Sequence, residues 1–260
     1  LNVIGLINIQ FAVKDSLIYI IEVNPRASRT VPFVAKATGL PLAAIAARVM
    51  AGEHLNVFGL VKPKLKHIAV KEAVLPFDRF PGVDTILSPE MRSTGEVMGL
   101  DTTFEKAFLK SQLAAGIQLP QNGKVFISIK DNDKKKPIIK ASQILSDLGF
   151  QILATKGTSK FLNKNGIKAE TINKVSEGRP NIVDLLKDKA VGLVFNTTEG
   201  HQSLEDSKEI RSISLRKKIP YYTTTAGCNA AARAIQANRD GNISVYKLQD
   251  LIQNNNTIDV

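Results

Sequence analysis

The sequence predicts an α/β fold: a Rossmann-like parallel sheet with helices on both faces, preceded by the tail of an α+β domain. Two observations support this prediction. Beyond residue 121, strand-like and helix-like segments alternate regularly, which is typical of a parallel sheet whose strands are joined by helices. Before residue 120, a hairpin pattern is followed by short helical segments and a connecting region. We therefore expect two domains, residues 1–120 and 121–260, with their boundary in the glycine- and proline-containing stretch 113–123.

The N-terminal domain is expected to begin with a β-hairpin. Residues 7–13 and 18–24 are β-type runs, and Lys14-Asp15-Ser16 has the composition of the turn that joins them. The elements expected after it are helices near 34–38 and 42–51, each ended by a glycine, short strands near 67–75, a turn at Pro81-Gly82 and a helix near 103–115.

The C-terminal domain is expected to alternate strands with helices. The expected strands are residues 124–129, 151–154, 168–172, 192–196 and 221–222. The expected helices are residues 138–148, 159–165, 182–187, 203–217 and 230–237. The polar run 253–256 is expected to be a frayed end. In this architecture ligands bind outside the carboxyl ends of the strands, so the loops at those ends should carry the functional residues.

The composition is ordinary for a globular protein, with 43% hydrophobic and 23% charged residues. The formal net charge of +11 permits nucleic-acid binding, but the basic residues are scattered and no aromatic platform is interleaved with them. We therefore predict no nucleic-acid partner. Only residues 130–140 are locally dense in lysine, and Asp131 and Asp133 interrupt them, which favours a solvated loop and leaves an anion site as the alternative.

Other global features bear on location. No apolar run approaches the roughly eighteen residues that a membrane span needs, so no membrane partner is predicted. The single Cys228 cannot form an internal disulfide, which suits a reducing, cytoplasmic location. The chain begins at Leu1 inside a strand-like run, and we expect a piece of a longer protein that carries no signal peptide.

The second β-type run ends in polar side chains that suit a metal and phosphate site. Side chains alternate along a strand, so Glu22 and Asn24 should project from one face, and the hairpin should bring Gln10 close to opposite Ile21 and Glu22. Their oxygen atoms suit Mg²⁺. Arg26 and Arg29 have the forked donors that match phosphate oxygens. An ordinary amphipathic hairpin with a polar end remains the alternative.

The loops that follow the C-terminal strands suit a phosphate. These loops are residues 154–158, 173–180 and 196–198. Threonine hydroxyls, amides at a helix N-terminus and a lysine all donate hydrogen bonds or positive potential to an anion. The alternative is that Thr158, Ser159 and Thr198 merely cap helices, as such residues often do.

The run 22–33 resembles the metal-binding strand of the ATP-grasp domain in the large chain of carbamoyl phosphate synthetase, and Gln10 falls where that family places its first metal ligand. The resemblance covers essentially the whole chain and continues through residues 36–39, 47–52, 70–72, 75–77 and 89–99. It is closest to the C-terminal portion of that large chain, where the second synthetase half is followed by a regulatory domain.

The resemblance implies an ATP-dependent ligase that makes carbamoyl phosphate from bicarbonate, glutamine-derived ammonia and two ATP, in pyrimidine and arginine biosynthesis. It implies ATP with Mg²⁺ or Mn²⁺, and K⁺ as a further ion. The metal ligands would be Gln10, Glu22 and Asn24, and the catalytic residues Arg26 and Arg29. A glutaminase small chain would be the partner that delivers ammonia, and the intact enzyme would be an oligomer.

The C-terminal half resembles the methylglyoxal-synthase-like regulatory domain of the same family, which implies a pocket for a nucleoside monophosphate such as UMP or IMP. The matching positions are Ser128, Lys134, Thr155, Thr158, Lys174, Asn196 and Thr198, with Lys135 competing with Lys134 for one role. Ornithine is an effector of bacterial members of the family, and Glu72, Tyr221 and Thr223 match part of its site. Tyr221 equally fits a core aromatic with a satisfied hydroxyl.

Two other functions stay open. One is a binding module that senses nucleotides and performs no chemistry. The other is a methylglyoxal-synthase-type lyase, which needs a carboxylate base poised over a phosphorylated triose. The lyase is disfavoured, because His201 is the only histidine in the C-terminal domain and the loops carry amide and hydroxyl groups where that lyase would need carboxylates.

Overall fold

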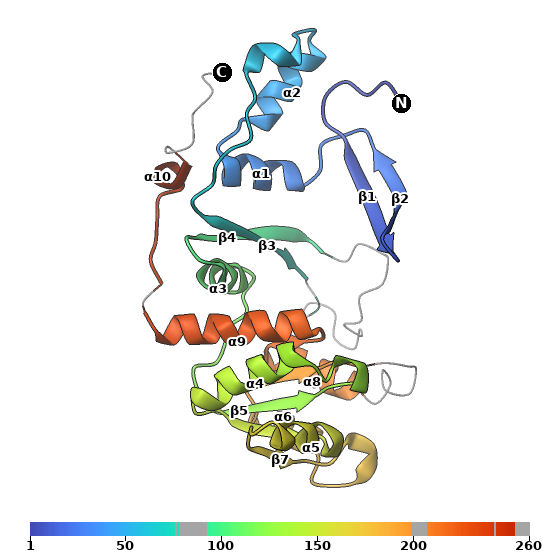
Figure 1. The fold of residues 1–260 in the computed structure, drawn as a ribbon, viewed down its shortest axis with the longest axis vertical. Helices are drawn as coiled ribbons and strands as arrows, with labels where there is room; N and C mark the ends of the chain where they lie inside the picture. Colours follow the sequence, from blue (N-terminus) through green and yellow to red (C-terminus); the bar gives the residue numbers. More distant parts are fainter. Residues whose placement is uncertain (76, 78–92, 199–206, 242, 253–260) are drawn as a thin grey trace. The chain divides into compact units, whose positions relative to one another are not determined.

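The computed structural model describes residues 1–75, 77, 93–198, 207–241 and 243–252 (Figure 1). Three features of the sequence lie outside these residues: the predicted turn at Pro81-Gly82, His201 and the polar run 253–256. The described chain forms two compact units. One comprises residues 1–69 together with the segment that begins at Ser244, and the other is Val70–Ile243.

The first unit begins with the predicted hairpin. Strands β1 (Asn8–Lys14) and β2 (Leu17–Asn24) pair antiparallel. Asp15 and Ser16 join them with positive φ angles of 50° and 65°, as in a two-residue type I′ turn, whose twist matches that of the strands. Most of the large apolar side chains on both strands are exposed.

Short helices complete this unit. Helices α1 (Thr30–Thr38) and α2 (Leu42–Met50) are followed by the 3₁₀ turn η1 (Leu55–Phe58), and α10 (Leu248–Ile252) contacts α1. Gly39 ends α1 in the left-handed conformation, φ 76°, and its N–H donates to the carbonyl of Ala35, which confirms the predicted stop. None of the described helices is by itself long and apolar enough to cross a membrane; α1 and α2 taken together meet the length and composition criteria, with a bend of 115° between them.

The second unit starts with a two-stranded sheet and a helix. Strand β3 (Ile68–Val74) pairs with β4 (Gly95–Asp101), and α3 (Phe104–Ala114) packs against β4. Strand β4 was not predicted from the sequence. Gly99 explains the close approach of α3, since a Cβ atom there would lie 1.9 Å from the carbonyl oxygen of Ala107 and 2.4 Å from the amide nitrogen of Ser111.

The rest of this unit is the predicted parallel sheet, with strand order β7-β6-β5-β8-β9 and parallel pairing between all neighbours. The strands are β5 (Lys124–Ser128), β6 (Gln151–Ala154), β7 (Ala169–Thr171), β8 (Leu193–Asn196) and β9 (Tyr221–Tyr222). The helices are α4 (Lys136–Asp147), α5 (Lys156–Lys164), α6 (Ile182–Lys187), α8 (Lys208–Lys217) and α9 (Thr225–Arg239).

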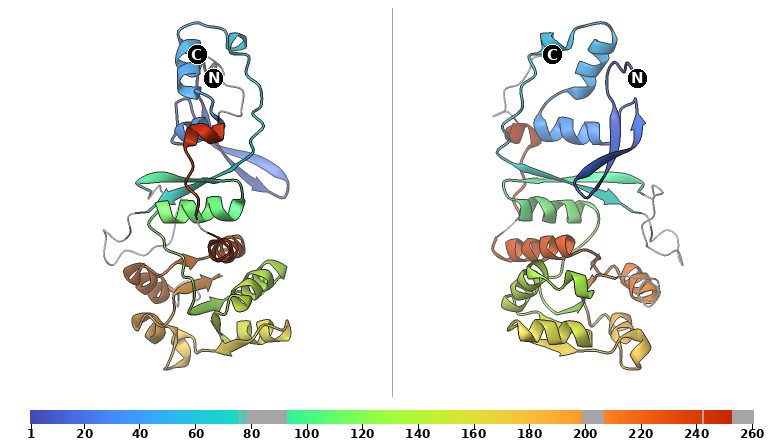
Figure 2. Two further views of the ribbon diagram at one scale, coloured as in Figure 1. Left: turned by 90° about the vertical axis from the view of Figure 1, so that its left-hand side faces the viewer. Right: turned by 45° about the vertical axis from the view of Figure 1, so that its right-hand side comes forward.

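Helices cover both faces of this sheet, as predicted (Figure 2). Side chains from β5 separate onto the two faces: Val125 and Ile127 join the core under α4, α5 and α9, whereas Phe126 joins the core under α6 and α8. Helix α9 also packs against α3, which contributes Leu109 to the first of these cores (Figure 1). The boundary predicted at 113–123 falls between α3 and β5, inside this second unit, and remains a prediction.

Four of the described helices begin earlier than predicted, among them α1 at Thr30 instead of residue 34 and α4 at Lys136 instead of residue 138. Helix α5 begins at Lys156 instead of residue 159, and α9 at Thr225 instead of residue 230. Both early turns contain a glycine, which lowered the expectation of helix. In α9 the start is fixed by a cap, because the hydroxyl of Thr224 accepts a hydrogen bond of 3.1 Å from the amide of Gly227.

Candidate metal and nucleotide-phosphate sites

The hairpin brings the predicted metal ligands onto one face. Gln10 and Glu22 are direct partners across β1 and β2, and directly opposite residues of an antiparallel pair point to the same side. Asn24 lies two residues further along β2, and its amide nitrogen donates a hydrogen bond of 2.7 Å to Oε1 of Glu22. The predicted geometry of these three residues is therefore observed.

This set of ligands is specific in its chemistry. It offers one carboxylate and two side-chain amides, oxygen donors of the kind that Mg²⁺ prefers when substrate phosphates and water complete its shell. Within the described ranges no group of three or more His, Cys, Asp or Glu residues is placed to hold a metal ion. A metal in this region would therefore depend on a mixed carboxylate and amide set, which the residues present can supply.

The two predicted arginines follow β2 directly. Arg26 is exposed, and its Nη1 donates a hydrogen bond of 3.2 Å to the carbonyl of Ala27. Arg29 is exposed at the residue that precedes α1. Both arginines thus lie in the short segment that joins the hairpin, at the end that carries the predicted metal ligands, to α1.

In the second unit, hydroxyl groups converge at the carboxyl ends of β5 and β6. The hydroxyl of Thr155 lies 3.4 Å from that of Ser128 and 3.2 Å from that of Thr158. The hydroxyl of Thr158 also accepts a hydrogen bond of 3.0 Å from the amide of Ile129. Thr155 and Thr158 are only 5% and 1% exposed, so these groups form a fixed polar cluster at the first turn of α5.

Lys134 reaches the same turn. Its Nζ lies 3.2 Å from the position that a Cβ atom on Gly157 would take, so the bare backbone of that glycine makes room for the ammonium group. Lys135, the competing residue in the sequence analysis, precedes α4 as its N-cap residue. The geometry thus favours Lys134 over Lys135 as a member of the predicted phosphate-binding group, called here the phosphate cluster, which consists of Ser128, Lys134, Thr155, Thr158, Lys174, Asn196 and Thr198.

The Lys134 ammonium group is paired with Asp131. Their Nζ and Oδ1 atoms are 2.6 Å apart. The hydrogen bond and charge of Lys134, together with the charge of Lys174, lower the pKa of Asp131 below its ordinary value. The positive charges of both lysines that were predicted to bind phosphate therefore stabilise the ionised form of Asp131.

At the end of β8, Asn196 and its neighbours face the same edge of the sheet. Asn196 pairs with Ser128 in the strand register, and its amide nitrogen donates to the hydroxyls of Ser207 at 3.0 Å and Tyr221 at 2.9 Å. Thr198 is half-buried two residues later. Thr197 lies in the predicted loop 196–198 but was given no role there, and its Oγ1 accepts a hydrogen bond of 3.1 Å from the amide of Lys130. Ser207 was not predicted, because its proximity to Asn196 has no local sequence pattern.

The three residues predicted for ornithine, Glu72, Tyr221 and Thr223, do not form one hydrogen-bonded group in the structure. Glu72 Oε2 accepts a hydrogen bond of 2.9 Å from Nε2 of Gln112, and Gln112 Oε1 accepts one of 2.9 Å from the hydroxyl of Tyr222. Tyr222, not Tyr221, is thus connected to Glu72, because adjacent residues of β9 point to opposite faces. Thr223 follows β9 and is exposed.

Burial changes the acidity of this second group. Burial raises the pKa of Glu72, and the hydrogen bond from Gln112 opposes that shift only in part. Burial, followed by the charges of Glu72 and Cys228, raises the pKa of Tyr222 as well. The Tyr222 phenol therefore stays protonated at neutral pH and acts as the donor.

Two family models match the chain. Residues 1–58 match the ATP-binding domain of the carbamoyl-phosphate synthase L chain, and residues 137–223 match the MGS-like domain. A carbamoyl phosphate synthase large chain from Rhizobium meliloti is 58% identical over 260 residues, which cover 97% of this chain and 22% of the relative. The chain is similar over nearly all of its length to one part of carbamoyl phosphate synthase large chains. Relatives from Mesorhizobium japonicum, at 56% over 256 residues, and Archaeoglobus fulgidus, at 51% over 251 residues, each share 96% of this chain and 22% and 23% of their own length.

The chain spans about a fifth of the length of the curated carbamoyl phosphate synthase large chains that it matches, 22% for the Rhizobium meliloti relative. The predicted metal ligands and arginines all lie in the part that matches the ATP-binding domain. Of the phosphate cluster, Thr155, Thr158, Lys174, Asn196 and Thr198 lie inside the MGS-like match, while Ser128 and Lys134 lie just before it.

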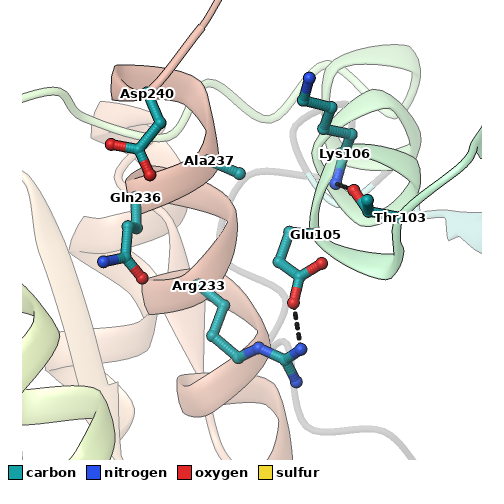
Figure 3. A pocket seen from close by; sticks show the side chains of 7 residues that line it. All are labelled: Thr103, Glu105, Lys106, Arg233, Gln236, Ala237 and Asp240. Carbon is teal, nitrogen blue, oxygen red and sulfur yellow. Dashed lines mark hydrogen bonds and ion pairs between the residues drawn. The ribbon is translucent and has the colours of Figure 1, made fainter.

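A separate pocket of about 310 Å³ lies between α3 and α9 (Figure 3). Its lining residues are Thr103, Glu105, Lys106, Arg233, Gln236, Ala237 and Asp240. Arg233 forms an ion pair with Glu105 and lies over the ring of Phe104, with 5.6 Å between the guanidinium carbon and the ring centroid. No residue that the sequence analysis selected lines this pocket, and its one arginine is already neutralised.

Proposed function

We propose that this chain is the metal-binding and regulatory part of an ATP-dependent ligase that makes carbamoyl phosphate. The observation that carries the proposal is the pairing of Gln10 with Glu22, with Asn24 bonded to Glu22, inside the match to an ATP-binding domain. The relatives are named carbamoyl phosphate synthase large chain. The substrates that we assign to the whole protein are bicarbonate, glutamine-derived ammonia and ATP.

In this proposal Gln10, Glu22 and Asn24 hold Mg²⁺ or Mn²⁺, which would supply positive charge beside the phosphate oxygens of the nucleotide. Arg26 and Arg29 would bind phosphate oxygens and stabilise the negative charge of the transferring phosphoryl group. A glutaminase small chain as partner, K⁺ as a further ion and a cytoplasmic location belong to the same proposal.

The test of the metal site compares two variants, each of which removes one carboxylate from a different end of the hairpin. In the full-length protein, Glu22→Gln should reduce ATP-dependent carbamoyl phosphate synthesis by roughly 100-fold or more, since a metal ligand is lost. Asp15→Asn is the matched control, because it removes a carboxylate from the turn at the other end of the same hairpin. Unchanged synthesis in Glu22→Gln would refute the assignment.

For the second unit the proposal is a regulatory site for a nucleoside monophosphate. Its phosphate would meet the hydroxyls of Ser128, Thr155 and Thr158 and the ammonium groups of Lys134 and Lys174. The convergence of these hydroxyls at the first turn of α5, where the carboxyl ends of parallel strands direct their ligands, supports this site. Asn196 and Thr198 would complete the pocket from β8.

Calorimetric titration of the chain with UMP and IMP tests the regulatory site. Lys174→Ala should weaken binding by roughly 1.5 to 3 kcal/mol, because charge-assisted hydrogen bonds are the strong ones. Lys168→Ala is the matched control. Lys168 is exposed and lies just before β7, at the amino-terminal ends of the parallel strands, whereas the proposed site lies at their carboxyl ends. Wild-type affinity for both nucleotides in Lys174→Ala would remove the pocket assignment.

A cationic amino acid such as ornithine is the second effector in this proposal. Glu72 supports it, because its partly buried carboxylate has a neutral donor, Gln112, and a protonated phenol beyond it. Because no cation is described beside this carboxylate, the positive charge of an ammonium group would stabilise its ionised form. We expect the effector's ammonium group to bind Glu72, and Glu72→Gln to abolish any response of the full-length enzyme to ornithine.

A further inference from the structure

Asp131 is placed against the lysine that the proposed nucleotide site needs. It is the first residue of the short 3₁₀ turn Asp131–Asp133, three residues after the end of β5. Its side chain is 93% exposed, whereas that of Lys134 is only 18% exposed. The lysine is therefore held against the protein surface, at Gly157, while the carboxylate approaches it from the solvent side.

The carboxylate also experiences the second candidate lysine. Lys174 precedes the 3₁₀ turn Val175–Glu177, and its positive charge favours the ionised form of Asp131. The neighbouring acid, Asp133, is oriented elsewhere, since its Oδ2 lies 4.0 Å from Nζ of Lys130. Asp131 thus differs from Asp133 in facing the positive charge of the phosphate cluster.

We infer that Asp131 competes with the effector's phosphate for Lys134 and so sets the affinity of the nucleotide site. This inference rests on the proposed regulatory function. An incoming phosphate needs the ammonium donors that Asp131 now occupies, and the two anions repel each other if they share the lysine. The displaced carboxylate returns to water with little penalty, because it is almost fully exposed and exposed ion pairs are weak.

The competition also favours dianions. A phosphate monoester with two negative charges gains more from Lys134 and Lys174 than a singly charged anion does, so it displaces Asp131 more readily. A singly charged anion would exchange one weak pair for another of similar strength. Asp131 therefore raises the charge that a ligand must carry to bind.

The test compares Asp131→Asn with Asp133→Asn by titration of the whole chain with UMP, IMP and inorganic phosphate. Both variants remove one carboxylate from the same turn. Asp131→Asn should tighten binding by about three- to tenfold, as expected for release of one ion pair with the phosphate-binding lysine, and Asp133→Asn should change it less than about twofold. The gain should shrink as salt is raised.

A double mutant completes the test. In a Lys134→Ala background, Asp131→Asn should tighten binding by much less than it does in the wild type, since most of its effect acts through the contact with Lys134 and only the weaker charge interaction with Lys174 remains. Equal tightening by Asp133→Asn, or unchanged affinity in both Asp131→Asn and Asp131→Ala while the wild type binds UMP or IMP, would overturn the inference. Failure of the wild type to bind either nucleotide would instead overturn the proposed regulatory site.

Discussion

The amide nitrogen of Gln112 donates a hydrogen bond of 2.9 Å to the carboxylate of Glu72. The same amide accepts from Tyr222 through its oxygen, so one side chain that is only 2% exposed joins β3 to β9. Tyr221, the other residue of β9, is bonded to Asn196 on the opposite side. One short strand therefore contacts both of the proposed effector sites.

The first prediction separates the two tyrosines. Tyr222→Phe should lower the free energy of unfolding by about 1 to 3 kcal/mol, because it leaves the buried oxygen of Gln112 without its donor. Nucleotide affinity should not change. Tyr221→Phe should instead weaken UMP or IMP binding by roughly fivefold, since a neutral hydrogen bond that orients Asn196 contributes about 1 kcal/mol.

Urea unfolding and calorimetric titration of both variants measure these two effects. Each variant serves as the control for the other, because both remove one hydroxyl from neighbouring positions. A Tyr222→Phe protein that loses nucleotide affinity as strongly as Tyr221→Phe would show that β9 does not separate the sites.

The second prediction concerns the effect of Glu72 on stability. Because burial raises its pKa, the folded state binds a proton more tightly than the unfolded state does. The stability from this group is fully present below its ordinary pKa near 4.3 and is lost as the pH rises through the raised value. Glu72→Gln should therefore be at least as stable as the wild type at pH 7.

Urea unfolding of the two proteins at pH 4 and pH 7 provides the check. The stability of the Glu72→Gln variant relative to the wild type should increase between these pH values. A relative stability that stays constant or falls would mean that ionised Glu72 is compensated in the folded protein.

The third prediction concerns Gly99. Gly99→Ala should cost roughly 1 to 3 kcal/mol or more, since its Cβ atom would overlap backbone atoms of α3, which cannot move away as a flexible side chain would. Gly95→Ala is the matched control, because nothing lies within 4 Å of a Cβ atom at that position of the same strand. It should change stability by less than about 0.5 kcal/mol. Thermal unfolding of both variants measures the two changes in stability. Equal destabilisation by both would indicate a general effect of glycine loss and not the packing of α3 against Gly99.

The fourth prediction concerns the ion pair of Asp101 with Lys110, whose Oδ2 and Nζ atoms lie 2.6 Å apart. Burial of Asp101 raises its pKa, but the hydrogen bonds and charge of Lys110, together with bonds from Thr102, outweigh burial and lower it. A lowered pKa contributes stability above the ordinary value near 3.9, and that stability is lost as the pH falls through the lowered value.

Asp101→Asn should therefore cost roughly 1 to 3 kcal/mol at pH 7, because it removes the buried carboxylate charge that lies 2.6 Å from Nζ of Lys110. The difference from the wild type should narrow at pH 3, where the wild type begins to lose the same interaction. Unfolding curves at the two pH values decide this, and a difference that is equal at both would contradict the role of the charge.

Much of the fold followed from local patterns. The strands β5, β6 and β8 were predicted because each is a short, mostly apolar run that the fold buries, and the hairpin was predicted because Lys14-Asp15-Ser16 separates two β-type runs. Strand β4 was missed because it contains two glycines, Gly95 and Gly99, which weaken a strand pattern. The close packing of α3 requires a glycine at position 99, and this tertiary contact cannot be predicted from the residues of β4 alone.

The site residues also divide into those predicted from local sequence patterns and those brought together only by the fold. The face shared by Glu22 and Asn24 follows from the alternation of a strand, and the hairpin supplies Gln10. In contrast, Tyr222 and Gln112 are separated by 110 positions, and no periodic pattern links them. The pairing of Asp131 with Lys134 is local, but the placement of Lys134 over Gly157 depends on the docking of α5.

The lengths of the outermost strands affect how this domain behaves in solution. The two edges of the described parallel sheet are β7, with 3 residues, and β9, with 2 residues. An edge strand offers unpaired backbone groups to which another chain can add, and a short one offers few. The described sheet therefore tapers at both sides, and its short edges disfavour edge-to-edge pairing between copies of this domain.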